Sequence, residues 1–193
     1  MILLPQDYVP QRAANRARMM PIRAARRARI GDQIVLAFEN AETLRYQIQE
    51  MVMVEAVTSP AAIAEEVQAY TRFVPNRSRL TATLFIENDD LATVRAELER
   101  LTGIQHLISL EIRTEAGEGI SVPGVEIPGA DEDGFSEITH AVHFLGFDFD
   151  DSARMAFLNP DNTVWATVAH RRYAEAAQLP ASVLAAVRGD LSN

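Results

Sequence analysis

The feature that most constrains the fold is a series of consecutive strand-like segments between residues 106 and 170. In "HLISLEIR", Ile108, Leu110 and Ile112 recur at the strand period of two. "HAVHFLGFDF" and "TVWATVAH" are also strand-like, and "GISVPGVEI" is typical of an edge strand. A parallel sheet needs a steady strand–helix–strand rhythm, which is missing. We therefore predict an α+β fold with a mainly antiparallel sheet and helices packed on one face.

Two further strands are expected in the first half of the chain. "QIVLAF", residues 33–38, follows Gly31 and Asp32, which can form a turn. "RLTATLFIE", residues 79–87, alternates apolar and polar residues as a half-buried strand does. Both segments would join the antiparallel sheet.

Helices are expected over residues 44–57 and from the N-cap Ser59, which Pro60 follows, to about Tyr70. Another helix would be capped by Asn88 or Asp89 and would end at Gly103. Its apolar stripe is Leu91, Val94, Leu98 and Leu101. "PASVLAAVRGDL", residues 180–191, predicts a last short helix.

We treat the 193 residues as a single α+β domain with two distinctive segments. Residues 1–29 form an arginine-rich N-terminal segment, whose helical pattern Pro10 and Pro21 interrupt, so two short helices are expected there. Residues 114–136 contain glycines, prolines and the run "GADEDG", which indicate an acidic loop region.

The missing residue types exclude several classes of site. Without cysteine there are no disulfides, thiolate nucleophiles, zinc ribbons or cysteine-ligated iron–sulfur clusters. Without lysine there is no Schiff base and no P-loop lysine. No segment has the roughly 18 apolar residues of a membrane span, and the first ten residues do not resemble a signal peptide. We expect a soluble, cytoplasmic protein.

Charge is segregated along the chain. Seven arginines lie within the first 31 residues beside Asp7 alone, whereas residues 114–153 hold ten acids and no arginine. The arginines could bind phosphate groups, but the net charge of −9 and the lack of a nucleotide-binding motif argue against nucleic acid. We favour contacts with the protein's own acidic segments or with an acidic partner.

The expected helix over residues 44–57 is apolar on most sides yet carries Glu50 and Glu55. On a helical wheel, Glu55 falls among Leu44, Ile48 and other apolar residues. A buried carboxylate has to be paired or protonated, because desolvation disfavours its charge. In one interpretation, Glu55 reaches solvent or pairs with an arginine. In the other, Glu50 or Glu55 is a ligand or general base in a pocket.

His140 and His143 would share a face on a helix, but a strand sends them to opposite faces. We expect His143 on the core side of a strand, and a hydrogen-bonded core histidine is the simplest interpretation. The alternative is a mixed metal site of His143 with Glu50, Glu55 or Glu87, which would suit iron, manganese or zinc. Nothing in the sequence requires a cofactor.

Four segments occur in order between about Pro21 and Phe149: "RRARIGDQIVLAFENAETLRYQIQEMVMVE", "SPAAIAEEVQAY", "LTATLFIE" and "AVHFLGF". Together they resemble a bacterial family catalogued as domain of unknown function 3501. Members of that family are often encoded beside rubrerythrin and an iron–sulfur oxidoreductase subunit. The resemblance therefore implies an association with redox or peroxide handling, and it brings no established catalytic residues.

The matching positions are the Phe38-Glu39-Asn40 turn, Arg45, Tyr46, Gln47, Glu50, Glu55, Glu87 and His143. Two positions depart from the pattern. His140 stands where a small polar residue is expected, and Gly146 stands where an arginine is expected. A family-wide role for His140 is therefore not expected, and an anion contact from that arginine is missing here.

Our leading hypothesis is a non-catalytic accessory or binding protein of a bacterial redox-stress system. It would act through a protein partner, with a rubrerythrin or an iron–sulfur oxidoreductase as candidates. The candidate ligand-binding cluster is Arg45, Tyr46, Gln47, Glu50 and Glu55, with His143 nearby. The alternatives are a metal-binding protein or metal-dependent enzyme using His143, Glu50, Glu55 and Glu87, and a nucleic-acid-binding regulator. The sequence does not decide whether the protein is an enzyme.

Overall fold

The computed structural model describes residues 1–90, 92–115, 117–128 and 139–192. The strands are β1 (Arg27–Ile30), β2 (Ile34–Phe38), β3 (Arg79–Ile86), β4 (Ile108–Arg113), β5 (Gly119–Glu126), β6 (Val142–Asp148), β7 (Thr163–His170) and β8 (Tyr173–Gln178). The α-helices are α1 (Pro5–Tyr8), α2 (Arg12–Ala24), α3 (Ala41–Val54), α4 (Pro60–Tyr70), α5 (Val94–Arg100), α6 (Asp151–Leu158) and α7 (Ala181–Ser192). The 3₁₀ turns are η1 (Val9–Gln11), η2 (Thr71–Phe73) and η3 (Ile104–His106).

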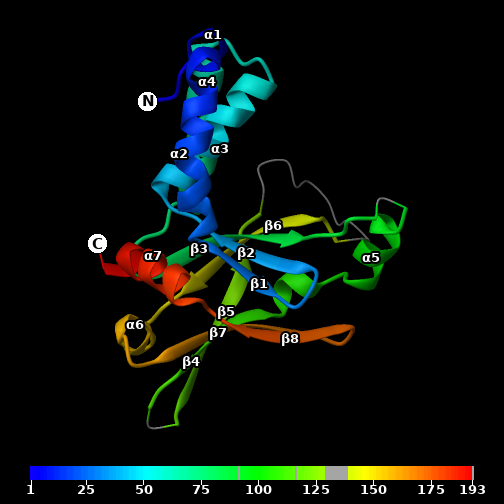
Figure 1. Ribbon diagram of the computed structural model, residues 1–193, viewed down its shortest axis with the longest axis vertical. Coiled ribbons are helices and arrows are strands. Elements are labelled where there is room, and N and C mark those ends of the chain that lie inside the picture. The colour runs from blue at the N-terminus through cyan, green and yellow to red at the C-terminus, as the bar shows by residue number, and fades with distance from the viewer. Residues whose placement is uncertain (91, 116, 129–138, 193) are drawn as a thin grey trace.

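These strands form one antiparallel sheet in the order β1-β2-β3-β6-β5-β4-β7-β8. The sheet curls into a nearly closed barrel, so that β1 and β8 approach each other (Figure 1). Tyr173 bridges them: its hydroxyl donates to the Ile30 carbonyl at 2.7 Å and accepts from the Gln33 amide at 3.1 Å. Gly31 has φ +64° against this hydroxyl, where a Cβ atom would overlap the tyrosine. The mainly antiparallel sheet is therefore confirmed.

β5 lies inside the sheet, so its predicted edge position is wrong. Residues 119–123 pair with β4, whereas residues 124–126 pair with β6. The strand changes partner at Gly124, where a Cβ atom would lie 3.1 Å from the Phe147 ring and 3.2 Å from the Ile108 carbonyl oxygen. Glycine at this position allows the close approach that the bend requires. The bend lets one strand serve both halves of the barrel.

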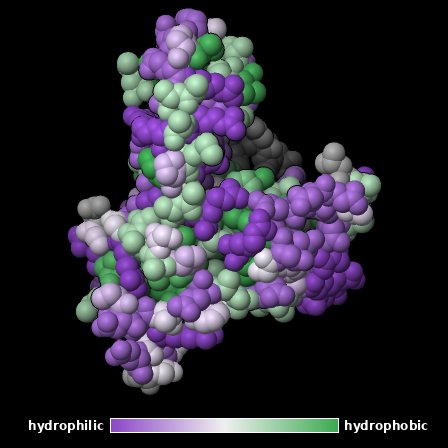
Figure 2. Space-filling model, viewed as in Figure 1, coloured by the Kyte–Doolittle hydropathy of each residue, from purple (hydrophilic) through white to green (hydrophobic). Residues whose placement is uncertain are grey.

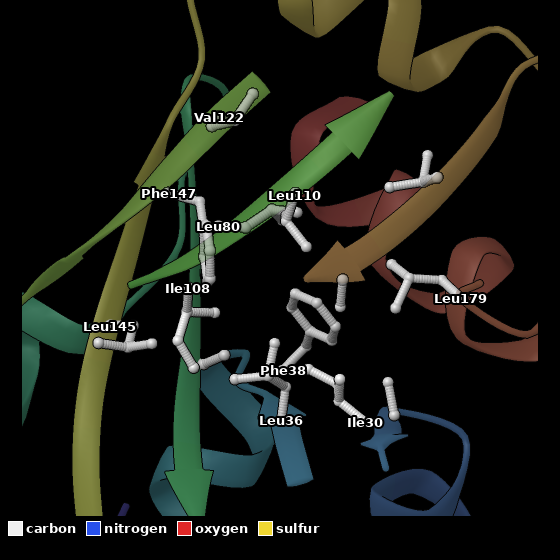
Figure 3. Close-up of a cluster of buried hydrophobic side chains, with 14 of the residues drawn as sticks. Ile30, Leu36, Phe38, Leu80, Ile108, Leu110, Val122, Leu145, Phe147 and Leu179 are labelled. Carbon is white, nitrogen blue, oxygen red and sulfur yellow. The ribbon is translucent and has the colours of Figure 1, made fainter. Parts of the chain in front are cut away.

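Apolar side chains from every part of the sheet fill the barrel. Figure 3 shows Phe38, Leu80, Leu110 and Phe147 pointing toward one another from separate strands. The helices α6 and α7 add Phe157, Val187 and Leu191 to this cluster. These helices belong to the barrel core.

The helices α1 to α4 form an arm that stands away from the sheet (Figure 1). Tyr8, Met19, Leu44 and Val52 are buried in the arm and lie outside the barrel cluster. At its base, η2 covers the outer face of the sheet, because the Phe73 ring stacks on Phe144 with centroids 4.2 Å apart. The helices thus contact the sheet on more than one side, so the predicted packing of the helices on one face of the sheet is not confirmed.

Several strand and helix predictions are confirmed, among them β2, β3, β4, β6, β7, α3, α7 and the helix α4 with its cap Ser59. Gly103 also ends the α5 region in the left-handed conformation, φ +87°. The cap of α5 was predicted wrongly, since Thr93 precedes its first residue and has no side-chain cap bond. Leu91 and residues 129–136 of the predicted acidic region lie outside the described residues.

The N-terminal prediction needs a larger correction. Pro21 lies inside α2, and Arg27–Ile30 is a strand although a helical pattern was expected through Arg29. Pro21 removes one backbone donor, but Met19 of the same helix is buried in the arm, and such packing outweighs local preference. The predictions also missed α6 and β8.

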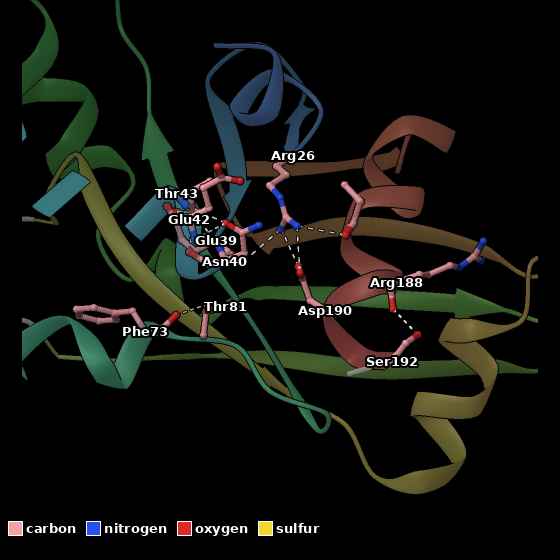
Figure 4. A network of polar contacts seen from close by, with 11 residues as sticks. Arg26, Glu39, Asn40, Glu42, Thr43, Phe73, Thr81, Arg188, Asp190 and Ser192 are labelled. Atoms are coloured by element: carbon pink, nitrogen blue, oxygen red, sulfur yellow. Dashed lines mark hydrogen bonds and ion pairs between the residues drawn. The ribbon is translucent and has the colours of Figure 1, made fainter. Parts of the chain in front are cut away.

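Strand β3 is more buried than expected. Thr81 and Thr83, on its outer face, are buried because the base of the arm covers them. Thr81 donates a hydrogen bond of 2.6 Å to the Phe73 carbonyl (Figure 4). The second face of β3 is therefore an interface between sheet and arm.

A buried ion pair joins the start of the sheet to the last helix. Arg26 is 6% exposed, and its guanidinium binds both carboxylate oxygens of Asp190 in α7, at 2.7 and 3.0 Å (Figure 4). The same guanidinium donates to the carbonyls of Glu39 and Ala186. One side chain thus holds three segments that are distant in sequence.

No helix in the described part of the chain combines the length and the apolar character that crossing a bilayer demands.

Replacing Asp190 with Ala is expected to lower the free energy of unfolding by about 3 to 5 kcal/mol, because it leaves the buried Arg26 without its counter-ion. The matched control is Arg95→Ala, which breaks the exposed pair of Arg95 and Glu99 and should cost about 0.5 kcal/mol or less. Urea unfolding of both variants measures the difference. Equal losses would show that the buried pair has no special role.

Candidate functional site

A pocket of about 480 Å³ lies between the arm and the outer face of the sheet. Helix α2 contributes Arg16, Met19, Met20 and Arg23 to its lining. Helix α3 contributes Thr43, Tyr46, Gln47, Glu50 and Met51. Thr83, Phe85 and Val142 of the sheet, with Glu39 from the turn before α3, complete it. We call this space the arm pocket.

Glu39 belongs to the floor of the arm pocket and is 7% exposed. It sits there because β2 ends at Phe38 and α3 begins just after Asn40, whose side chain accepts from the amides of Glu42 and Thr43. The Glu39 amide also donates to the Thr81 carbonyl at 2.8 Å, which fixes the turn to β3. Strand pairing and helix capping therefore position this carboxylate.

Two hydroxyl groups hold the Glu39 carboxylate. Thr83 donates to one oxygen at 2.6 Å, and Thr43 donates to the other. The Thr43 hydroxyl also accepts from the Asn40 amide at 2.9 Å, and the Asn40 carbonyl oxygen lies 3.1 Å from it. All three side chains are buried, so the carboxylate is held in one orientation.

The opposite wall of the arm pocket carries two exposed arginines of α2. The Arg23 guanidinium lies 5.8 Å from the centre of the Tyr46 ring, a cation–π contact. Within the described part of the chain, neither Arg16 nor Arg23 forms an ion pair. Arg16 acts on the Glu50 carboxylate through its charge, and both guanidinium groups are exposed at the pocket.

Glu50, at the rim of the arm pocket, is bound by two donors. The Tyr8 hydroxyl donates to it at 2.7 Å, and the Arg12 guanidinium donates at 2.8 and 3.1 Å. Burial raises the pKa of the Glu50 carboxyl, but the hydrogen bonds and nearby positive charge outweigh burial and hold this pKa below its ordinary value. Glu50 is thus a paired carboxylate.

The predicted cluster is only partly brought together. Tyr46, Gln47 and Glu50 line the arm pocket. Arg45 is exposed on another side of α3, and Glu55 is exposed at the C-terminal end of that helix. Glu55 thus reaches solvent, as one of the two interpretations of the sequence expected.

The four candidate metal ligands lie in separate surroundings. Glu50 binds Tyr8 and Arg12, Glu87 pairs with Arg27 and Arg29, and Glu55 is exposed. His143 is buried on the inner side of β6 with Leu145 and Phe147. Over the described ranges, no three His, Cys, Asp or Glu side chains are grouped so that they could hold a metal ion.

Both ring nitrogens of His143 are occupied by the protein. Nδ1 lies 2.5 Å from a Glu126 oxygen, and Nε2 lies 2.8 Å from the Thr139 hydroxyl and 2.9 Å from the His140 carbonyl oxygen. His143 therefore has the contacts of a hydrogen-bonded core histidine, which was the simplest interpretation of the sequence.

Sequence reasoning missed Glu39, Thr43 and Thr83 as site residues. One signal was present, because Glu39 lies in the Phe38-Glu39-Asn40 turn that matched the family pattern. Glutamate is not among the residues that dominate turns, unlike glycine, proline, asparagine, aspartate and serine. Nothing in the sequence pointed to Thr43 and Thr83, because they come close to the Glu39 carboxylate only in the folded structure.

The chain is similar to a known protein family and to a solved structure. The family model described as "Protein of unknown function (DUF3501)" matches residues 1–191. A crystal structure of a "novel protein of unknown function" from Burkholderia pseudomallei K96243 is similar, with 33% sequence identity and a TM-score of 0.85. The match covers 98% of this chain and 96% of that chain. No curated protein matches.

Replacing Tyr8 with Phe removes one hydrogen bond to Glu50 and is expected to lower the free energy of unfolding by about 1 to 3 kcal/mol at pH 7. Burial and the Glu50 carboxylate raise the pKa of Tyr8 above its usual 10.0. The native state therefore keeps the Tyr8 proton at pH values where the unfolded chain loses it, so this stabilisation is complete below pH 10 and declines above it. The stability difference between wild type and Tyr8→Phe should narrow as the pH rises above 10.

Urea unfolding at a series of pH values tests this expectation. Tyr46→Phe is the control, because the Tyr46 hydroxyl has no hydrogen bond within the described part of the chain, and it should cost less than about 0.5 kcal/mol at pH 7. A stability difference for Tyr8→Phe that is independent of pH would contradict the role given to the Tyr8 proton.

Proposed function

The chain belongs to the DUF3501 family, and we propose that it is a non-catalytic binding protein that holds a small ligand in the arm pocket and acts through a protein partner. The observation that carries this proposal is the buried Glu39 carboxylate, held by two hydroxyls on the floor of an open pocket. Glutamate is rarely buried unless its carboxylate is paired or hydrogen-bonded, because desolvation of the charge is costly. A volume of about 480 Å³ is also within the usual range of small-molecule sites.

Two features of the pocket favour binding over catalysis. Its described lining holds no histidine and no serine, and its two threonine hydroxyls are buried donors to Glu39. Both oxygens of Glu39 accept hydroxyl protons, which suits a fixed charge that attracts a ligand. The pocket thus offers a hydrogen-bonded carboxylate that can recognise a ligand.

The protein partner is a separate part of the proposal. A groove of about 260 Å³ on the arm is lined by apolar residues, including Leu44, Ile48 and Val67, with the exposed Arg45 at its side. Figure 2 shows hydrophobic residues on the arm surface among hydrophilic ones. Arg45 has no ion pair with any described residue, so it complements an acidic group. We assign the groove to an acidic amphipathic segment of the partner.

The family resemblance supports a redox setting for that partner, with a rubrerythrin or an iron–sulfur oxidoreductase as the first candidates. The metal-binding alternative has less support. It needs His143 as a ligand, whereas both nitrogens of His143 are engaged by Glu126, Thr139 and the His140 carbonyl. Metal ligation through His143 would break these contacts.

Filling the arm pocket should abolish ligand binding. Val142 lines the pocket and is 43% exposed, so Val142→Trp can occupy the space without disturbing the core. Val125→Trp is the matched control, because Val125 is an exposed strand valine outside the pocket lining. After equilibrium dialysis against a protein-free metabolite extract, mass spectrometry should find a small molecule enriched by wild type and Val125→Trp. The proposal fails if Val142→Trp enriches the same molecules equally.

Reversing the charge of Arg45 should weaken partner binding, because Arg45→Glu would repel an acidic segment. The candidate partners are purified, and their Kd values for wild type, Arg45→Glu and the distant control Arg95→Glu are compared by calorimetry. We expect Arg45→Glu alone to raise the Kd of the partner about tenfold or more. Equal affinities for all three proteins, or no binding of either candidate, would count against this part of the proposal.

A further inference from the structure

The floor of the arm pocket carries a negative charge with no cationic partner. Glu39 receives neutral hydroxyl donors from Thr43 and Thr83 (Figure 4 shows Glu39 and Thr43), and the start of α3 adds the partial positive charge of a helix N-terminus. The counter-ion of the buried Arg26 is Asp190, and the hydrogen bond from Arg26 to Glu39 goes to the backbone carbonyl oxygen and not to the carboxylate. Within the described part of the chain, the carboxylate forms no ion pair. A buried carboxylate in this state attracts an ammonium group.

The opposite wall has the reverse charge. Arg12 and Arg18 of α2 pair with Glu50 and Glu42. Arg16 and Arg23 of the same helix line the pocket and form no ion pair among the described residues, although the charge of Arg16 helps to hold the pKa of the Glu50 carboxyl low. Arginine binds carboxylate and phosphate groups in bidentate geometry, so this wall suits an anion.

Apolar side chains complete the lining. Met19, Met20 and Met51 come from the two helices, and Phe85 and Val142 come from the sheet. Methionine is unbranched and adapts to irregular shapes, so these residues can pack along a flexible aliphatic chain. The lining thus combines a negative floor, a positive wall and apolar contacts between the helices and the sheet.

We propose that the arm pocket binds a small zwitterion, with its ammonium on Glu39, its anionic group on Arg16 and Arg23, and an aliphatic linker against the methionines. The inference rests on the proposed binding function and specifies the chemical class of the ligand. Ligands with a single charge should therefore bind to the pocket less tightly than zwitterions.

Three probes of equal chain length separate the contributions of the ammonium and the carboxylate to binding: 6-aminohexanoate, hexylamine and hexanoate. Their Kd values are measured by NMR chemical-shift titration, which detects weak binding. We expect 6-aminohexanoate to bind wild type about tenfold or more tightly than either singly charged probe, because each additional charge-assisted contact has an effect of about this size.

Variants assign the two ends of the probe. Glu39→Gln should raise the Kd values of 6-aminohexanoate and hexylamine about tenfold and leave the Kd of hexanoate unchanged. The double variant Arg16→Gln, Arg23→Gln should weaken 6-aminohexanoate and hexanoate and leave hexylamine unaffected. It changes only exposed residues, so it keeps the test valid if Glu39→Gln does not fold. Arg95→Gln, on the exposed surface of α5, should change none of the three values.

The outcomes separate the inference from the function on which it rests. If all three probes bind equally and Val142→Trp abolishes them all, the pocket binds ligands but the zwitterion inference is wrong. If none of the probes binds wild type, the inference is also wrong. The binding function itself fails only when the metabolite dialysis shows no dependence on Val142→Trp.

Discussion

The buried ion pair of Arg26 and Asp190 is the contact on which the arrangement of the sheet, the arm and the last helix depends. A guanidinium that is 6% exposed must be fully hydrogen-bonded, because leaving such a charge unpaired costs several kcal/mol. Its partners are Asp190 and Ala186 of α7 and the Glu39 carbonyl. The segment before β1, the turn before α3 and the C-terminal helix therefore meet at one point. The turn that this contact holds also carries the carboxylate of the arm pocket.

The arm changes the character of the sheet it covers. In an exposed sheet, the outer positions of a strand face water, and Thr81 and Thr83 would be ordinary surface residues. Under the arm both are buried, so each hydroxyl needs a partner, and the partners are the Phe73 carbonyl and the Glu39 carboxylate. The Glu39 carboxylate is consequently buried and hydrogen-bonded, whereas Arg16 and Arg23 of α2 are exposed.

Much of the fold was predictable, because it depends on local patterns. The alternation of Leu80, Ala82 and Leu84 predicted β3, and Ser59 with Pro60 predicted the start of α4. The failures have non-local causes. β1 is short and rich in arginine, so its local pattern continued that of α2, and only pairing with β2 makes it a strand. β8 ("YAEAAQ") has the composition of a helix and is a strand because it pairs with β7. β5 became an interior strand through the bend at Gly124.

By itself, the sequence determined the fold class, most of the elements, the family and the amphipathic helix α3 that supplies Tyr46, Gln47 and Glu50 to the pocket. The elements follow from periodicity and capping residues, and the family follows from the resemblance of several segments in order along the chain. Only the tertiary structure decided that Glu39, Thr43 and Thr83 share hydrogen bonds, and that His143 binds Glu126 rather than the carboxylates of α3. Those contacts join residues from different elements. They depend on strand register and on the position of the arm, which side-chain patterns along a single segment do not encode.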